Sequence, residues 1–146
     1  MGHLHEREIS QHCGLHAGKA GSGVAFMPHV APFFQGISLT TSAHLRPAGA
    51  SRAAIKADDV RKAFEDYYRG ERLVRVLPAG AMPDVRSHEL GDLAHGVTVG
   101  GFTFDAATGR VAIVSCIDNL LKGAATQAVQ NMNLALGIEE TKGILD

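Results

Sequence analysis

Two histidines near the start of the chain, His3 and His5, are separated by a single residue. Imidazole titrates near neutral pH, so such a pair beside a cleft is suited to proton transfer. The alternative is two solvated histidines at a frayed end, which the short pattern alone favours. The pair is therefore a candidate site that needs support from other residues.

A wider set of histidine and cysteine side chains around this pair suggests zinc as a second hypothesis. Its members are His3, His5, His12, Cys13 and His16. Their spacing matches no familiar zinc pattern, and a zinc site needs four converging ligands with a supporting outer shell. We therefore expect no metal site. The other cysteine, Cys116, lies in an apolar segment and is expected to be a small buried residue.

The stretch from Asp118 to Ala125 places polar and small residues where a strand is expected to meet a helix. Helix N-termini expose backbone N–H groups and the positive end of the dipole, so they bind anions or amides. The small residues Gly123 and Ala124 leave room for a ring or for another backbone. This junction is the second candidate site.

The helix after this junction shows the clearest periodicity in the chain. Its apolar stripe comprises Leu121, Ala125, Ala128, Met132 and Leu136, and Asp118 or Asn119 is expected to cap its start. It also carries the amides Gln127, Gln130, Asn131 and Asn133. So many amides indicate a wet interface with another domain or subunit, and the alternative is a capped helix with one solvated face.

The other elements follow from hydrophobic spacing and from turn residues. We expect helices over 7–12 and from 57 or 58 to Gly70, and strands over 37–45, 73–77, 97–104 and 111–117. A bulge is expected at the Gly100–Gly101 pair, and loops over 14–23 and 47–52. The order predicts an α+β fold, in which a mixed and largely antiparallel sheet is covered by helices on one face. No strand leads into the Gly-rich turn of a dinucleotide-binding fold.

Composition limits the class of protein. The chain has 146 residues, of which 45% are hydrophobic and 20% charged, with a formal net charge of −1. This suits one domain over residues 1–146 and provides no basic surface for nucleic acid. No apolar run reaches the roughly 18–20 residues of a membrane span, and the charged start lacks a signal or transit pattern. Two cysteines exclude a disulfide scaffold and favour a reducing compartment.

Three stretches, in the same order as in the family, resemble N-acetyl-gamma-glutamyl-phosphate reductase. The stretch from Ile117 to Asn133 resembles its C-terminal signature. The stretch from His3 to Ile9 resembles its H-x-H-x-x-E-I element, and the stretch from Phe26 to Pro32, followed by Gln35-Gly36-Ile37, resembles its P-H-hydrophobic-x-P stretch before R-G-I. The resemblance covers nearly the whole chain and is closest to the fungal form. It implies the C-terminal domain of the glyceraldehyde-phosphate and aspartate-semialdehyde dehydrogenase fold.

The resemblance implies a reaction in which a cysteine thiolate attacks N-acetyl-glutamyl-phosphate and NADPH reduces the resulting thioester to the semialdehyde in arginine biosynthesis. His3 would be the general acid/base and His5 a substrate contact, and the reverse order stays open. Gln35 would also contact the substrate, at a position where the family often has Arg. The cofactor NADP would meet Asn119, Lys122, Gly123 and Ala124.

The family's N-terminal half, with its Gly-rich turn and its cysteine in an N-P-G-C context, has no counterpart in this sequence. We therefore expect a chain that is inactive alone, completed by that half and assembled as a dimer or tetramer. A bacterial cytoplasmic location is expected, or the mitochondrial matrix if the source is fungal. Two alternatives stay open: a stand-alone dimerisation or binding module derived from the enzyme, and a small metal-binding protein built on the N-terminal histidine and cysteine residues.

Overall fold

The computed structural model describes residues 3–13, 23–45, 55–86 and 92–145. The expected linker and all but the last residue of the expected glycine-rich loop lie outside these ranges. The elements are α1 (Leu4–His12), β1 (Ile37–His44), α2 (Ala57–Tyr67), β2 (Val74–Val76), η3 (Asp92–His95), β3 (Val97–Asp105), β4 (Arg110–Ile117), η4 (Leu121–Ala125) and α3 (Thr126–Ala135). Apart from the short helices η3 and η4, this is the order that the sequence predicted.

The chain divides into two compact units, residues 1–33 and residues 34–146. In the first unit, the described residues contain α1 and an irregular segment over 23–33. The second unit contains the sheet and the remaining helices. The interpretation of residues 1–146 as one domain stays a prediction.

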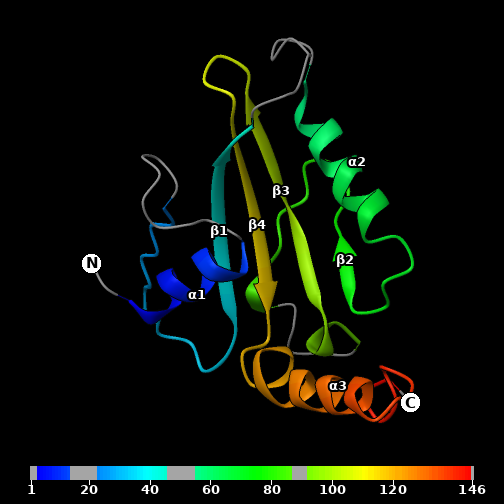
Figure 1. Cartoon of the computed structure of the whole chain (residues 1–146). Helices are drawn as coiled ribbons and strands as arrows, with labels where there is room; N and C mark the ends of the chain where they lie inside the picture. The colour runs from blue at the N-terminus through cyan, green and yellow to red at the C-terminus, as the bar shows by residue number, and fades with distance from the viewer. Residues whose placement is uncertain (1–2, 14–22, 46–54, 87–91, 146) are drawn as a thin grey trace. The chain divides into compact units, whose positions relative to one another are not determined.

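The second unit is built on a four-stranded sheet in the order β1-β4-β3-β2 (Figure 1). The pairs β1–β4 and β3–β4 are antiparallel, and β2 pairs with β3 in parallel. The helix α3 crosses below the end at which β4 finishes, so the end of β4 and the start of the helix form one junction (Figure 1). The predicted fold class is thereby confirmed.

The glycine pair in β3 forms the predicted bulge. The register between β3 and β4 shifts between Gly100 and Thr103, and Gly101 has a φ of 60°. A Cβ atom at Gly101 would lie 2.7 Å from the sulfur of Met82. Both the backbone conformation and the close approach of Met82 therefore require glycine at this position.

One face of the sheet is only partly covered. On this face α2 packs against β3 through Phe64 and Phe102, whose ring centroids lie 5.4 Å apart. Toward the β1 edge, Ile37 and Leu39 are 46% and 44% exposed. Paired residues of neighbouring strands share a face, so the partner of Ile37, Ile117, lies on this same face. Of the residues in β4, only Val111 and Cys116 are fully buried, and the other apolar residues of the strand are partly exposed.

The burial of the last helix differs from the prediction made from its sequence. Its expected apolar stripe is exposed at Met132 (52%) and Leu136 (65%), whereas Gln130 and Asn133 are buried. The side-chain amide of Asn133 donates to the backbone oxygens of Glu140 and Lys142, at 3.1 and 2.9 Å. The prediction of a wet interface is therefore wrong for these two amides, because they bind the chain's own C-terminal segment.

Candidate functional site

The two candidate histidines lie at the start of α1. His3 is the N-cap residue, and its Nδ1 atom accepts a hydrogen bond from the backbone N–H of His5 at 3.3 Å. The two imidazole rings lie with their centroids 4.8 Å apart. The helix therefore begins at the histidine pair, and the pair is held together by the N-cap.

His5 also has a carboxylate partner. Its Nδ1 atom lies 2.6 Å from Oε2 of Glu8, one helical turn further on. Both side chains are about half exposed, at 56% and 49%, so the pair lies at the surface. A carboxylate bound to one ring nitrogen fixes the tautomer and orientation of an imidazole.

Phe26 forms a wall beside both histidines. Its ring centroid lies 5.0 Å from that of His3 and 5.7 Å from that of His5. Its backbone N–H donates to Oε1 of Glu6 at 3.1 Å, which holds this segment against α1. Sequence reasoning missed these parts played by Glu6, Glu8 and Phe26, although the i, i+3 spacing of His5 and Glu8 was a visible signal.

The second candidate site, at the end of β4, is organised by Asp118. This carboxylate is 1% exposed. Its Oδ1 atom accepts the backbone N–H groups of Leu120 and Leu121 at 2.8 and 2.9 Å, so Asp118, one of the two residues predicted as the cap, makes these bonds. Its Oδ2 atom accepts the side-chain amide of Gln35 at 2.9 Å. Gln35 is thus bound to the junction rather than extended into solvent.

The neighbouring residue makes a parallel contact. The Oδ1 atom of Asn119 accepts the backbone N–H of Gly36 at 2.5 Å. Gly36 has a φ of 110°, and a Cβ atom there would lie 2.4 Å from Val85. Two hydrogen bonds therefore join residues 35–36 to residues 118–119, and they leave the Nδ2 group of Asn119 without a partner among the described residues.

The helix after this junction begins with a π-turn. The backbone N–H of Ala125 bonds to the oxygen of Leu120, five residues earlier. The N–H of Gly123 bonds in the same way to the oxygen of Asp118. Gly123 and Ala124 are exposed. The sequence predicted a plain helix here, whereas π-turns of this kind are rare and occur often at functional sites.

Lys122 is directed along the helix. Its Nζ atom donates to Oε1 of Gln130 at 2.6 Å, and the amide of Gln130 donates to Glu140. Burial lowers the pKa of the Lys122 ammonium, and the nearby Glu140 carboxylate partly offsets this effect. The ammonium is therefore tied to the C-terminal segment, so this part of the structure offers no unbound cation to a ligand.

The predicted site residues thus form two groups. His3 and His5 lie in the first unit, and Gln35, Asn119, Lys122, Gly123 and Ala124 lie in the second. Within the second unit, the structure joins Gln35 to the Asp118–Asn119 junction. The placement of the two groups in a single site stays a prediction.

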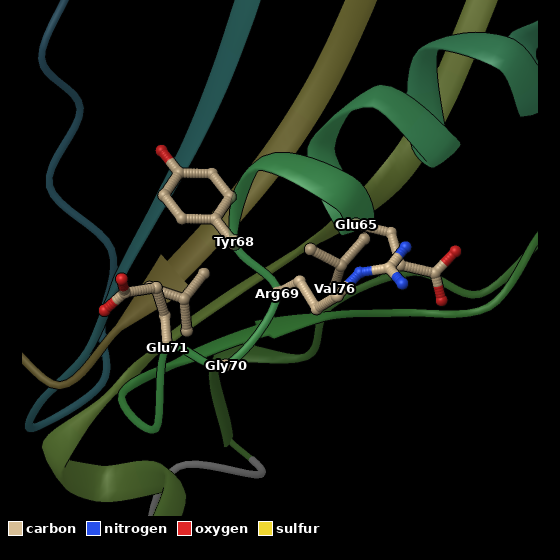
Figure 2. Close-up of a pocket in the computed structure, with 7 residues that line it drawn as sticks. Glu65, Tyr68, Arg69, Gly70, Glu71 and Val76 are labelled. Atoms are coloured by element: carbon tan, nitrogen blue, oxygen red, sulfur yellow. The ribbon is translucent and has the colours of Figure 1, made fainter.

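A shallow pocket of about 570 Å³ lies elsewhere, at the turn between α2 and β2 (Figure 2). Its lining residues are Glu65, Tyr68, Arg69, Gly70, Glu71, Val74 and Val76. In Figure 2 the charged groups of Arg69 and Glu71 lie on opposite sides of the turn at Gly70. None of the predicted site residues lines this pocket, and its charges do not converge, so it is not the candidate site.

Among the described residues, no group of three or more His, Cys, Asp or Glu side chains is placed to hold a metal ion. His16, one member of the zinc hypothesis, lies outside the described residues. In the same described ranges, no helix is long and apolar enough to cross a membrane.

The two cysteines should react with a thiol reagent at very different rates. Cys13 is exposed, whereas Cys116 is 1% exposed and burial raises the pKa of its thiol. We expect the native chain to react at one thiol quickly and at the second only after unfolding in urea. Cys13→Ser should abolish the fast reaction, and Cys116→Ser should leave it intact. Two equally fast thiols in the native chain would contradict the buried position of Cys116.

The family of the chain follows from a comparison with protein-family models. Residues 1–119 match the model described as semialdehyde dehydrogenase, dimerisation domain. The chain belongs to this family. The match includes the histidine pair, the sheet, and Asp118 and Asn119 at the junction, whereas Lys122, Gly123 and Ala124 lie beyond its end.

Individual relatives narrow this assignment. The chain is 48% identical over 143 residues to "Protein arg-6, mitochondrial" of Neurospora crassa, a match that covers 98% of this chain and 14% of that protein. It is 43% identical over 143 residues to the N-acetyl-gamma-glutamyl-phosphate reductase of Pelotomaculum thermopropionicum, covering 97% of this chain and 38% of that enzyme. The resemblance to this reductase is thereby confirmed, with fungal and bacterial relatives. The chain spans less than half the length of these curated relatives.

A solved structure supports the fold. Aspartate semialdehyde dehydrogenase II from Vibrio cholerae matches 73% of this chain and 28% of its own, with a TM-score of 0.55 and 24% sequence identity. At this identity the likeness shows the fold alone. It agrees with the mixed sheet and helices described above.

Proposed function

We propose that this chain supplies the C-terminal, substrate-facing part of an NADP-dependent reductase that converts N-acetyl-glutamyl-phosphate to N-acetyl-glutamate semialdehyde and phosphate. The observation that carries the proposal is the 43% identity, over nearly the whole chain, to a relative named for that activity. The nucleophilic cysteine and most of the cofactor site would come from an N-terminal half. The assembled enzyme would lie in the bacterial cytoplasm, or in the mitochondrion if the source is fungal. The name of the Neurospora crassa relative includes the word mitochondrial.

The junction at Asn119 fits one end of the cofactor. Because the Oδ1 atom of Asn119 is bound to Gly36, its Nδ2 group is left as a hydrogen-bond donor, which matches the carboxamide oxygen of a nicotinamide. A Cβ atom at Gly123 would meet nothing closer than 3.4 Å, so the exposed backbone there leaves room for a flat ring. When bound, NADPH supplies the hydride. Asn119, Gly123 and Ala124 would orient it, and Lys122 would lie beside them in the same π-turn.

The histidine pair fits the substrate. An acyl phosphate carries negative charge, and the reaction needs one group that moves a proton and one that binds an oxygen. The two imidazoles beside Phe26 offer both functions within one turn of α1. Gln35, bound to Asp118, would act on the substrate through the junction or after rotation of its amide.

The experiment that tests this function is reassembly. The chain is mixed with the N-terminal half of the Pelotomaculum thermopropionicum reductase, and NADPH oxidation is followed with the acyl phosphate as substrate. We expect activity that rises with the ratio of the two parts and that neither part shows alone. A covalent fusion of the two parts serves as a second arm, because it removes the need for association. No activity in either arm would contradict the proposal.

A second candidate function is a stand-alone dimerisation module. The observation that favours it is the family model itself, which describes a dimerisation domain, together with the half-exposed apolar residues of β1. This function predicts a stable homodimer whose stability does not change when NADPH is added. A change in dimer stability with NADPH would favour the reductase instead.

A further inference from the structure

We propose that Gln130 and Glu140 are positioning residues for the cofactor. Through the side chain of Lys122 they hold the π-turn over 121–125 in the form that exposes its backbone to a ring. The C-terminal segment, residues 138–145, thereby takes part in binding the nicotinamide end of NADPH. The identity of this ligand rests on the proposed function, whereas the hydrogen bonds that link the segment to the turn belong to this chain alone.

The side-chain amide of Gln130 links a cation to an anion. Its Oε1 atom accepts the Lys122 ammonium at 2.6 Å, and its Nε2 group donates to Oε1 of Glu140. An ammonium only donates hydrogen bonds and a carboxylate only accepts them, so the amide satisfies both groups in one orientation only. Gln130 is 9% exposed, so the loss of either partner would leave a buried polar atom without a hydrogen bond. The position of the ammonium therefore depends on Glu140 through Gln130.

Glu140 lies on a segment that is itself fixed. The side-chain amide of Asn133, which is 3% exposed, donates to the backbone oxygens of Glu140 and Lys142. The hydroxyl of Thr141, the residue after Glu140, accepts the Arg72 guanidinium at 2.7 Å, and Thr141 is 4% exposed. Figure 1 shows this segment folded back beside the end of α3. The backbone around Glu140 is therefore held, and its carboxylate is presented in a fixed position.

Lys122 lies within the π-turn, both ends of which are bound by side chains. At the start of the turn, the Asp118 carboxylate accepts two backbone N–H groups. At its end, the hydroxyl of Thr126, which is 3% exposed, bonds to Nδ1 of His95 at 2.7 Å. Lys122 reaches a residue eight positions further on, so its side chain runs along about two turns of the helix. A geometry that is rare in helices is thus held from β4, from η3 and from the C-terminal segment.

Loss of this link would change the backbone that faces the cofactor. Without it the turn can relax to α-helical bonding, in which each N–H group bonds four residues back rather than five. The N–H of Gly123 would then bond to the oxygen of Asn119 instead of that of Asp118. This change would move Gly123 and Ala124, where the ring is expected to lie. The link should therefore affect the affinity for NADPH and not the histidine pair, which lies in the other unit.

The first test measures amide hydrogen exchange in the full chain by NMR. The N–H groups of Gly123 and Ala125 form the π-turn bonds, and the N–H of Val114, in the central strand β4, reports on the sheet. Glu140→Ala should accelerate exchange at Gly123 and Ala125 by about threefold to tenfold and leave exchange at Val114 within about twofold. No acceleration in the π-turn, or an equal acceleration at Val114, would overturn the positioning role.

Three further variants define the path from the segment to the turn. Glu139→Ala removes the same charge one residue earlier, from a side chain that bonds to Thr141, and should leave the π-turn amides within about twofold. Glu140→Gln keeps an oxygen for the amide of Gln130 and should restore most of the protection. Gln130→Leu should act as strongly as Glu140→Ala, and the double variant should exchange no faster than Gln130→Leu alone. Additive effects, or an equal effect of Glu139→Ala, would show that Glu140 does not act through Gln130 and would overturn the proposal.

The second test measures NADPH binding by titration calorimetry, with the chain fused to the N-terminal half. Glu140→Ala and Gln130→Leu should each raise the Kd of NADPH about threefold to tenfold, and Glu139→Ala should leave it unchanged. In the activity assay, the first two variants should raise the KM for NADPH with little change in the KM for the acyl phosphate. An unchanged Kd, or an equal rise in both KM values, would overturn the role in the cofactor site. An unsubstituted fusion that does not bind NADPH would count against the proposed function, while the exchange measurement still decides whether the segment holds the turn.

Discussion

Replacing Asp118 with alanine should lower the free energy of unfolding by roughly 2–4 kcal/mol. The carboxylate is 1% exposed and accepts three hydrogen bonds, two from the backbone at the start of the last helix and one from the side chain of Gln35. Loss of the cap leaves two N–H groups without their acceptor. The loss also releases Gln35, so both ends of the junction weaken together.

Two further variants separate the cap from the link to Gln35. Asp118→Asn keeps an oxygen for the N–H groups of Leu120 and Leu121, and Gln35 accepts the new amide after rotation of its own. We therefore expect a loss of no more than about 1 kcal/mol. Gln35→Ala removes only the link and should cost about 0.5–1.5 kcal/mol. Urea unfolding followed by circular dichroism measures all three, and equal losses for Asp118→Ala and Gln35→Ala would show that the cap contributes nothing.

The same junction shows where sequence reasoning succeeded and where it failed. A cap at Asp118 or Asn119 was predicted because a short polar side chain before an apolar helix is a local signal, and Asp118 is the residue that accepts the N–H groups. The contact between Gln35 and Asp118 joins residues 83 positions apart, so no local pattern encodes it. The π-turn was also not predicted. Its backbone N–H groups bond to oxygens five residues earlier, and no residue pattern in the sequence indicates this bonding.

The prediction for the amides of the last helix failed for a related reason. Helical periodicity identifies which residues share a face, but it does not say which face the rest of the chain covers. In this chain the segment after Gly137 folds back, and Asn133 binds the backbone at Glu140 and Lys142. Gln130 and Asn133 are therefore buried inside the unit, and the apolar residues Met132 and Leu136 are left exposed.

The strands were predicted well because their signals are local. Alternation in β1, the glycine pair in β3 and the turn between Asp105 and Arg110 each act within a few residues. The partners of His3 and His5 could not be predicted in this way. A sequence shows two histidines at a fixed spacing, but only the structure shows that the His3 ring contacts the backbone of α1 and the His5 ring contacts Glu8.

The largest change in assembly should come from a single lysine on the open face of the sheet. We expect the chain to sediment with at least twice its mass of 15.4 kDa, and Leu39→Lys to return it to a monomer. Leu39 is 44% exposed and lies on the same face as Ile37 and Ile117. A second copy that covers this face would bury two like charges in the variant, so the dissociation constant should rise at least about a hundredfold.

Two matched controls define which surface is involved. Thr40→Lys places the same charge on the same strand but on the opposite face, so it should leave the dimer intact. Met132→Lys charges the exposed face of the last helix, where we expect the N-terminal half to dock. Met132→Lys should remain a dimer but give no activity when it is mixed with the N-terminal half. Leu39→Lys should instead dissociate into monomers. Analytical ultracentrifugation distinguishes these outcomes. A clean monomer of the unsubstituted chain, or equal dissociation by both β1 variants, would rule out this face as the contact between copies.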